Sequence, residues 1–166
     1  MTDQMNSAVK MAGFFAAHAI WSVCEGETLI PLLGMETPDG QRKMLRLANE
    51  RIEDGVQQGQ VWLKENPDRA LRAVLVFDGF ITLATGKIDA LLVSIRDYSL
   101  QPRCLVMAVP YRSANIPGGF AVYRPKFLSF EGPEPNWQEI ADSFFKGVDS
   151  HEKAAPIWNQ YLDQSI

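Results

Sequence analysis

Residues 72–112 read RAVLVFDGFITLATGKIDALLVSIRDYSLQPRCLVMAVPYR, and this stretch decides the fold. Residues 72–83, 88–98 and 104–112 are rich in Val, Ile, Leu, Phe and Tyr, which predicts three strands. Residues 120–130 have the same character and predict a fourth strand. A parallel crossover needs roughly a dozen residues or more, so the short connections here predict an antiparallel meander.

The first predicted strand carries apolar side chains on both of its faces. A sheet that is apolar on both sides must be covered on both sides, by helices or by a partner. The two faces are Leu75, Phe77, Ile81 and Leu83 on one side, and Val74, Val76 and Phe80 on the other.

Helical patterns lie on either side of the meander. Residues 7–24, 49–65 and 136–148 repeat apolar side chains at three- and four-residue steps, and Pro156 starts or kinks a last helix. Asn136 and Asp149 each precede a glutamate by three residues, which is the spacing of a capping box. Gly55 and Gly59 weaken the second helix by roughly 1 kcal/mol each relative to alanine, unless another backbone packs closely there.

Residues 28–47 allow two interpretations. Residues 28–36 look extended and Pro38 and Gly40 suit a tight turn, so residues 41–47 return as the second strand of a hairpin; alternatively, residues 43–47 begin the next helix. The sequence as a whole predicts a single α+β domain over residues 1–166. We expect an antiparallel meander of at least four strands, with an added N-terminal hairpin in the first interpretation, packed against N-terminal, middle and C-terminal helices.

Composition excludes several classes of protein. The chain has 166 residues, of which 46% are hydrophobic and 22% charged, so disorder and collagen-like repeats are excluded. A net charge of -4 with dispersed basic residues argues against nucleic-acid binding. The apolar run that begins at Met11 is shorter than the roughly 20 residues a membrane span needs. Asp3 and Val23 argue against a signal peptide, and the two distant cysteines favour free thiols, so we expect a cytoplasmic protein away from the membrane.

Polar residues on the predicted strands are the best candidates for a ligand site. An acid with arginines and tyrosines on adjacent strands could bind an anion or a carboxylate, because arginine offers a bidentate fork and tyrosine a hydroxyl on a rigid ring. Strand register decides whether these side chains converge. In the other interpretation they are ion pairs and strand ends at the sheet surface. The candidates are Asp78, Arg96, Tyr111, Arg112, Tyr123 and Arg124.

Other motifs in the sequence give weaker evidence for a catalytic, phosphate-binding or metal-binding site. His18 could act as a general base, but Cys24 lies six residues further along the helix and diverges from it, so a core histidine is the simpler interpretation. Residues 117–119, Pro-Gly-Gly, lead into another strand, which indicates a hairpin loop and no phosphate-binding loop. His18 and His151 have no carboxylate or cysteine at metal-ligand spacing. We therefore expect no metal and no cofactor.

These observations favour a non-catalytic binding or adaptor module that forms a homo-oligomer, most simply a dimer, and contacts a protein partner. In layout the predicted chain resembles the type III secretion chaperone-like group, whose small acidic α+β members often act as homodimeric binding modules. The alternative is a small hydrolase or anionic-ligand-binding enzyme with an Asp/Arg/Tyr pocket on the sheet.

Overall fold

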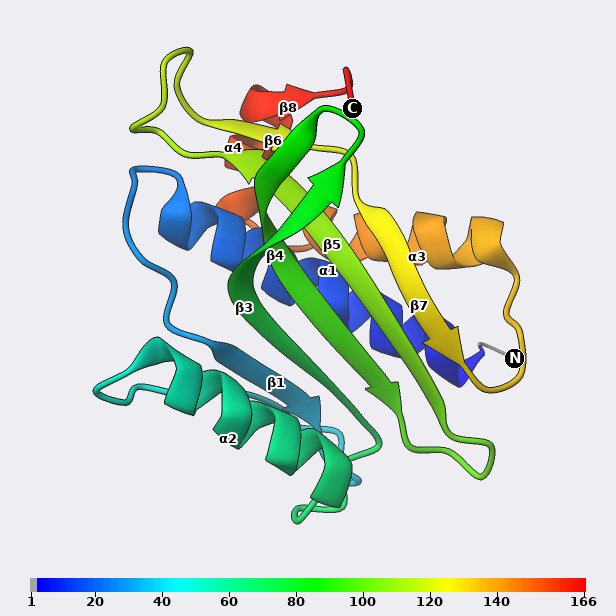
Figure 1. Cartoon of the computed structure of the whole chain (residues 1–166). Helices are drawn as coiled ribbons and strands as arrows, with labels where there is room; N and C mark the ends of the chain where they lie inside the picture. The colour runs from blue at the N-terminus through cyan, green and yellow to red at the C-terminus, as the bar shows by residue number, and fades with distance from the viewer. Residues whose placement is uncertain (1–2) are drawn as a thin grey trace.

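The computed structural model describes residues 3–166, and in that part of the chain it has four helices and eight strands (Figure 1). The helices are α1 (Gln4–Val23), α2 (Ile52–Glu65), α3 (Trp137–Asp149) and α4 (Ala154–Tyr161). The strands are β1 (Leu32–Glu36), β2 (Arg42–Arg46), β3 (Arg72–Leu83), β4 (Gly86–Asp97), β5 (Arg103–Arg112), β6 (Ala121–Tyr123), β7 (Lys126–Glu131) and β8 (Leu162–Asp163). The predicted α+β class is confirmed.

The sheet runs in the order β2-β1-β3-β4-β5-β6-β8, and β7 also pairs with β5. Strands β3, β4 and β5 follow one another as antiparallel neighbours, which confirms the meander over that part of the chain. β1 and β2 form the N-terminal hairpin, so the interpretation in which residues 43–47 begin a helix is wrong.

The predicted strand over residues 120–130 is two strands, and this part of the prediction is wrong. β6 pairs with the end of β5, whereas β7 pairs with its earlier part. Arg124 and Pro125 separate β6 from β7. Proline has no backbone N–H to donate to a ladder, so a change of partner strand falls naturally there. β8 runs parallel to β6, and the whole sheet is therefore mixed.

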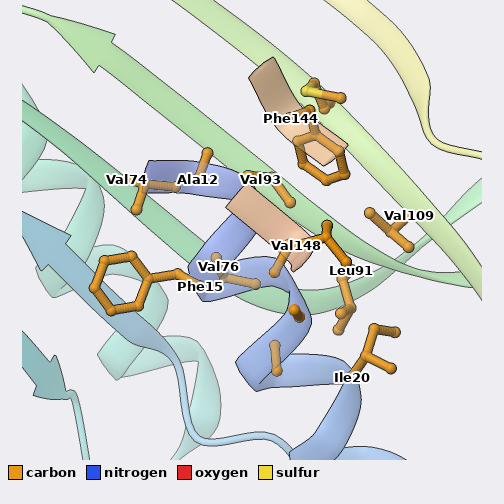
Figure 2. Packing of buried hydrophobic residues seen from close by; sticks show 14 of the residues in the cluster. Ala12, Phe15, Ile20, Val74, Val76, Leu91, Val93, Val109, Phe144 and Val148 are labelled. Atoms are coloured by element: carbon orange, nitrogen blue, oxygen red, sulfur yellow. The ribbon is translucent and has the colours of Figure 1, made fainter. Parts of the chain in front are cut away.

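The larger core lies between the sheet and α1, and α3 and α4 pack on α1 from the other side. Side chains of alternate residues on β3, β4 and β5 point towards α1 (Figure 2). α1 is therefore buried on almost every side, and even its alanines have no exposed surface. The residues labelled in this core are Ala12, Phe15, Ile20, Val74, Val76, Leu91, Val93, Val109, Phe144 and Val148.

A smaller core lies on the opposite face of the sheet, beneath α2 (Figure 1). Leu33 of β1 and Leu75 of β3 pack there against Leu63 of α2. Beyond α2, the same face of β4 and β5 carries Leu92 and Val106, which are half-buried. Helices therefore cover one face of the sheet from β1 to β5 and the other face mainly over β1 and β3, whereas the side chains of β2 are exposed on both faces.

Candidate functional site

One stripe of α1 points away from the sheet core and carries aromatic rings. Phe14, His18 and Trp21 follow at four- and three-residue steps, so they line one side of the helix. The stripe meets His151, which lies in the turn between α3 and α4. The His151 ring stacks on Phe14 with 4.7 Å between ring centroids, and Trp21 meets it edge-on at 5.7 Å.

His18 and His151 are hydrogen-bonded to each other although 133 residues separate them in the chain. The distance from His18 Nδ1 to His151 Nε2 is 3.0 Å. His151 Nδ1 accepts a hydrogen bond from the backbone N–H of Ala154, at 3.0 Å, so this nitrogen carries no proton. The proton of neutral His151 is then on Nε2 and is donated to His18 Nδ1. By the same logic, neutral His18 carries its proton on Nε2, on the side of the ring facing away from His151.

The bond from Ala154 also corrects the predicted second cap. Asp149 is the last residue of α3, and His151 satisfies the first free N–H of α4 in place of an Asp149 side chain. His151 thus has two roles, because its Nδ1 accepts the first N–H of α4 and its Nε2 donates the proton that fixes the tautomer of His18.

Both histidines favour the neutral form. Burial lowers the pKa of His18 below its ordinary value of 6.5, and the nearby His151 and Arg46 lower it further. Burial likewise lowers the pKa of His151. Protonation would place two N–H groups face to face within the pair, or would break the bond from Ala154.

We therefore expect the free energy of unfolding to fall as the pH drops below about 6.5, because the two histidines then bind protons in the unfolded chain more readily than in the folded chain. Above that pH this contribution is fully present. Urea unfolding at pH 7.5, 6.5 and 5.5 measures the loss, and His18→Gln should flatten the profile because glutamine does not titrate. A wild-type profile as flat as that of the variant would contradict the assignment.

Two adjoining hollows lie on either side of His18 and Trp21. One, of about 410 Å³, is bounded by α1 and β2 and includes Phe14, Arg42, Met44 and His151. The other, of about 400 Å³, opens towards residues 24–30 and includes Arg46, Glu27 and Ile157. We call the two together the α1–β2 groove. Its walls combine aromatic rings with arginines, a composition that is common at protein interfaces.

The groove contains no activated nucleophile among its described residues. Burial raises the pKa of the Cys24 thiol, and Glu25 and Glu27 raise it further, so the reactive thiolate is disfavoured. The Ser22 hydroxyl donates to the carbonyl oxygen of His18 at 2.9 Å. The groove is therefore better suited to binding than to nucleophilic chemistry.

Of the six strand residues predicted as a ligand site, the structure brings two together. Tyr111 Oη donates to Asp78 Oδ1 at 2.7 Å, across the intervening strand β4. Burial raises the pKa of Asp78, which the Tyr111 bond opposes and the nearby Asp89 increases. Burial and the Asp78 carboxylate also raise the pKa of Tyr111.

The other four of these residues lie elsewhere. Arg112 follows Tyr111 directly, so its side chain points to the other face, where it donates to the carbonyl oxygens of Gly119 at 2.6 Å and Gly118 at 3.0 Å. Arg96 lies beside Cys104 in a separate hollow of about 280 Å³ next to α2. Tyr123 is buried on β6, and Arg124 Nε donates to the carbonyl oxygen of Ile166 at 3.0 Å.

A second exposed surface lies at β7, which within residues 3–166 pairs with β5 along one edge and leaves its other edge open. Phe127 and Leu128 of this strand and Phe145 of α3 are large apolar side chains that are two-fifths to half exposed. A hollow of about 320 Å³ between β7 and α3 includes Met107, Phe144 and Phe145. Exposed apolar side chains beside an open strand edge are typical of a protein-binding surface.

Comparisons with known proteins add no relative: no family model, no curated protein and no solved structure matches this chain. Within residues 3–166, no helix is both long and apolar enough to cross a lipid bilayer. No group of three or more His, Cys, Asp or Glu side chains in the same residues is arranged to hold a metal ion.

Proposed function

We propose that this protein is a non-catalytic, cytoplasmic binding module that self-associates as a dimer and acts as an adaptor. The observation that carries the proposal is the open edge of β7 with its exposed apolar side chains. Both cysteines, Cys24 and Cys104, are free thiols, which suits a reducing compartment.

The sequence of β7 is self-complementary. It reads Lys-Phe-Leu-Ser-Phe-Glu over residues 126–131, so two copies running antiparallel about a central two-fold axis place Lys126 opposite Glu131 of the second copy. The same register places Phe127 opposite Phe130 and Leu128 opposite Ser129. Opposite charges and aromatic rings facing each other across strands are both favourable pairs.

The faces of the strand agree with this register. Phe127 and Phe130 both pack on Trp137 of α3, with ring centroids at 5.0 and 5.3 Å, so both lie on the helix side of the sheet. Lys126 and Glu131 pair with Ala108 and Cys104, on the other side. Leu128 is the extra residue of a β-bulge, so Phe127 and Phe130 lie on the same face although they are three residues apart. Shifting the register of the two copies by one residue in either direction would place side chains from different faces opposite each other.

Charge reversal on β7 tests the proposal. Lys126→Glu replaces two attractive pairs in the dimer by two Glu–Glu contacts, and we expect the dimer dissociation constant to rise roughly tenfold. Glu131→Lys should have a similar effect, and the double variant should restore dimerisation because the attractive pairs return with reversed sign. Sedimentation equilibrium at several concentrations measures all four proteins.

The control is Lys87→Glu at the start of β4, which makes the same charge change on a strand that β5 separates from β7. It should leave the dissociation constant unchanged. A wild-type protein that stays monomeric at high micromolar concentration would contradict self-association. A dimer whose double variant is no tighter than the single variants would contradict the register.

The second candidate function is a hydrolase or anionic-ligand-binding enzyme, favoured by the hydrogen bond between Asp78 and Tyr111. It ranks lower because the arginines that would bind an anion point to other surfaces. Arg112 and Arg124 already donate to backbone carbonyl oxygens, as described above.

A further inference from the structure

The strand β2, at the other end of the sheet from β6 and β8, has an open edge beside the α1–β2 groove. Within the described residues it pairs with β1 alone, and all of its side chains are exposed. Its outer N–H and C=O groups are therefore free to pair with one more strand. Peptides commonly bind by adding a strand to such an edge, with backbone hydrogen bonds giving affinity and alternate side chains giving specificity.

The register of β2 decides which side chains reach the groove. Arg46 pairs with Leu32, which lies in the larger core, and Met44 pairs with Gly34, which contacts the Phe15 ring of α1. Arg42, Met44 and Arg46 therefore lie on the α1 side. Lys43 and Leu45 alternate to the α2 side of the same strand. An added strand would likewise present every second side chain to the groove.

Cations dominate the middle of the groove. Arg46 makes no salt bridge within residues 3–166, and Arg42 shares the carboxylate of Glu36 with Arg72, at 3.1 and 2.7 Å. The ammonium group of Lys153 lies 5.9 Å from the centre of the Trp21 ring. The acidic residues Glu25 and Glu27 line the same hollow as Arg46, whereas the hollow beside Phe14 has Arg42 and Lys43 and no acidic side chain among the described residues.

Apolar contact is available between the two arginines. Met44 and Trp21 are each about two-fifths exposed, and both border the hollow beside Phe14. Methionine adapts its shape to different side chains, and tryptophan offers a large flat surface. The order along β2 is thus cation, apolar, cation at two-residue spacing.

We infer that the edge of β2 and the α1–β2 groove bind an extended, acidic peptide segment of a partner protein as an additional strand. The matching peptide has acid, apolar and acid side chains at two-residue spacing, opposite Arg42, Met44 and Arg46. This inference builds on the proposed role as a binding module, but it does not depend on the pairing of β7.

A fluorescein-labelled peptide, Thr-Glu-Thr-Leu-Thr-Glu-Thr, is the probe. Fluorescence polarisation should show saturable binding that weakens as salt is added, because the ion pairs are exposed. A second peptide of the same composition, Thr-Glu-Glu-Leu-Thr-Thr-Thr, breaks the two-residue spacing and should bind at least threefold more weakly. Equal binding of the two peptides would contradict strand addition.

Charge reversal locates the site. Arg46→Glu should weaken binding of the first peptide roughly fivefold, and a peptide in which the glutamates are replaced by lysine should bind this variant better than the wild type. Lys43→Glu is the matched control. Lys43 borders the hollow beside Phe14, but it alternates with Arg42 and Met44 and pairs with Met35 of the smaller core, so the same charge change falls on the α2 side of the strand. Equal losses from the two variants would indicate nonspecific attraction and overturn the site.

The variants also separate this inference from the dimer. Lys126→Glu should leave peptide affinity unchanged, and Arg46→Glu should leave the dimer dissociation constant unchanged. If Arg46→Glu instead abolishes dimerisation while Lys126→Glu does not, the occupant of the β2 edge is a second copy of the chain. If neither β2 variant alters peptide binding, the inference is wrong even where the β7 dimer is confirmed.

Discussion

Replacing Gly147 by alanine is expected to lower the free energy of unfolding by about 3 kcal/mol or more. Gly147 lies in α3 where that helix crosses α1, and a Cβ atom there would lie 1.8 Å from the carbonyl oxygen of Lys10. The contact is reciprocal, because a Cβ atom on Gly13 of α1 would lie 1.9 Å from the carbonyl oxygen of Phe144. Backbone atoms cannot turn aside as a side chain can, so the two helices must separate. Both belong to the larger core.

Gly59→Ala in α2 is the matched control. Its Cβ atom would meet only the ends of the Leu75 and Leu47 side chains, at 2.5 and 3.0 Å, and these can change rotamer. Alanine also favours a helix by about 1 kcal/mol over glycine, so we expect a small net change. Urea unfolding of both variants makes the comparison. Similar stabilities would mean that α1 and α3 do not approach each other as closely as described.

The strand positions of the meander could be predicted because they rest on local chemistry. β3 begins at Arg72 and ends at Leu83 as the apolar pattern predicts, with short turns on either side of β4. Pro125 is the local signal that residues 120–130 form two strands, because proline has no backbone N–H to donate to a ladder. The sequence also predicts that Gly55 weakens α2 unless another backbone packs closely there, and the carbonyl oxygen of Leu47 does lie 2.4 Å from where a Cβ of Gly55 would be.

The candidate sites were harder to predict because they depend on contacts between distant segments. Asp78 and Tyr111 meet because their strands flank β4 and their side chains share a face, which register alone decides. Nothing local indicates that His18 would meet His151. The available signal is that His18 continues the aromatic stripe of Phe14 and Trp21, and that the sequence has one other histidine, His151, shortly before the last predicted helix.

The charged network around Asp97 is the other place where we expect a single substitution to change the free energy of unfolding strongly. The Asp97 carboxylate is almost completely buried, and Arg103 donates to it from Nε at 3.2 Å and from Nη2 at 3.0 Å. The backbone N–H of Ser99 donates to its other oxygen at 3.0 Å. Arg103 also contacts Asp3, the N-cap of α1, and so connects β5 to the first helix.

Arg103→Met is expected to lower the free energy of unfolding by about 3–5 kcal/mol, because it leaves the buried Asp97 charge without a counter-charge. Asp3→Asn should cost less than about 1 kcal/mol, since Asp3 is largely exposed and asparagine also caps helices. Chemical unfolding at pH 7 measures both.

The double variant Arg103→Met with Asp97→Asn separates an unpaired charge from lost packing. Asparagine carries no charge and its oxygen can still accept from Ser99, so the double variant should regain at least about 1 kcal/mol over Arg103→Met alone. If it is less stable than the single variant, the loss comes from the packing of the arginine stem. In that case the ion pair would contribute little to the stability of the β4–β5 turn.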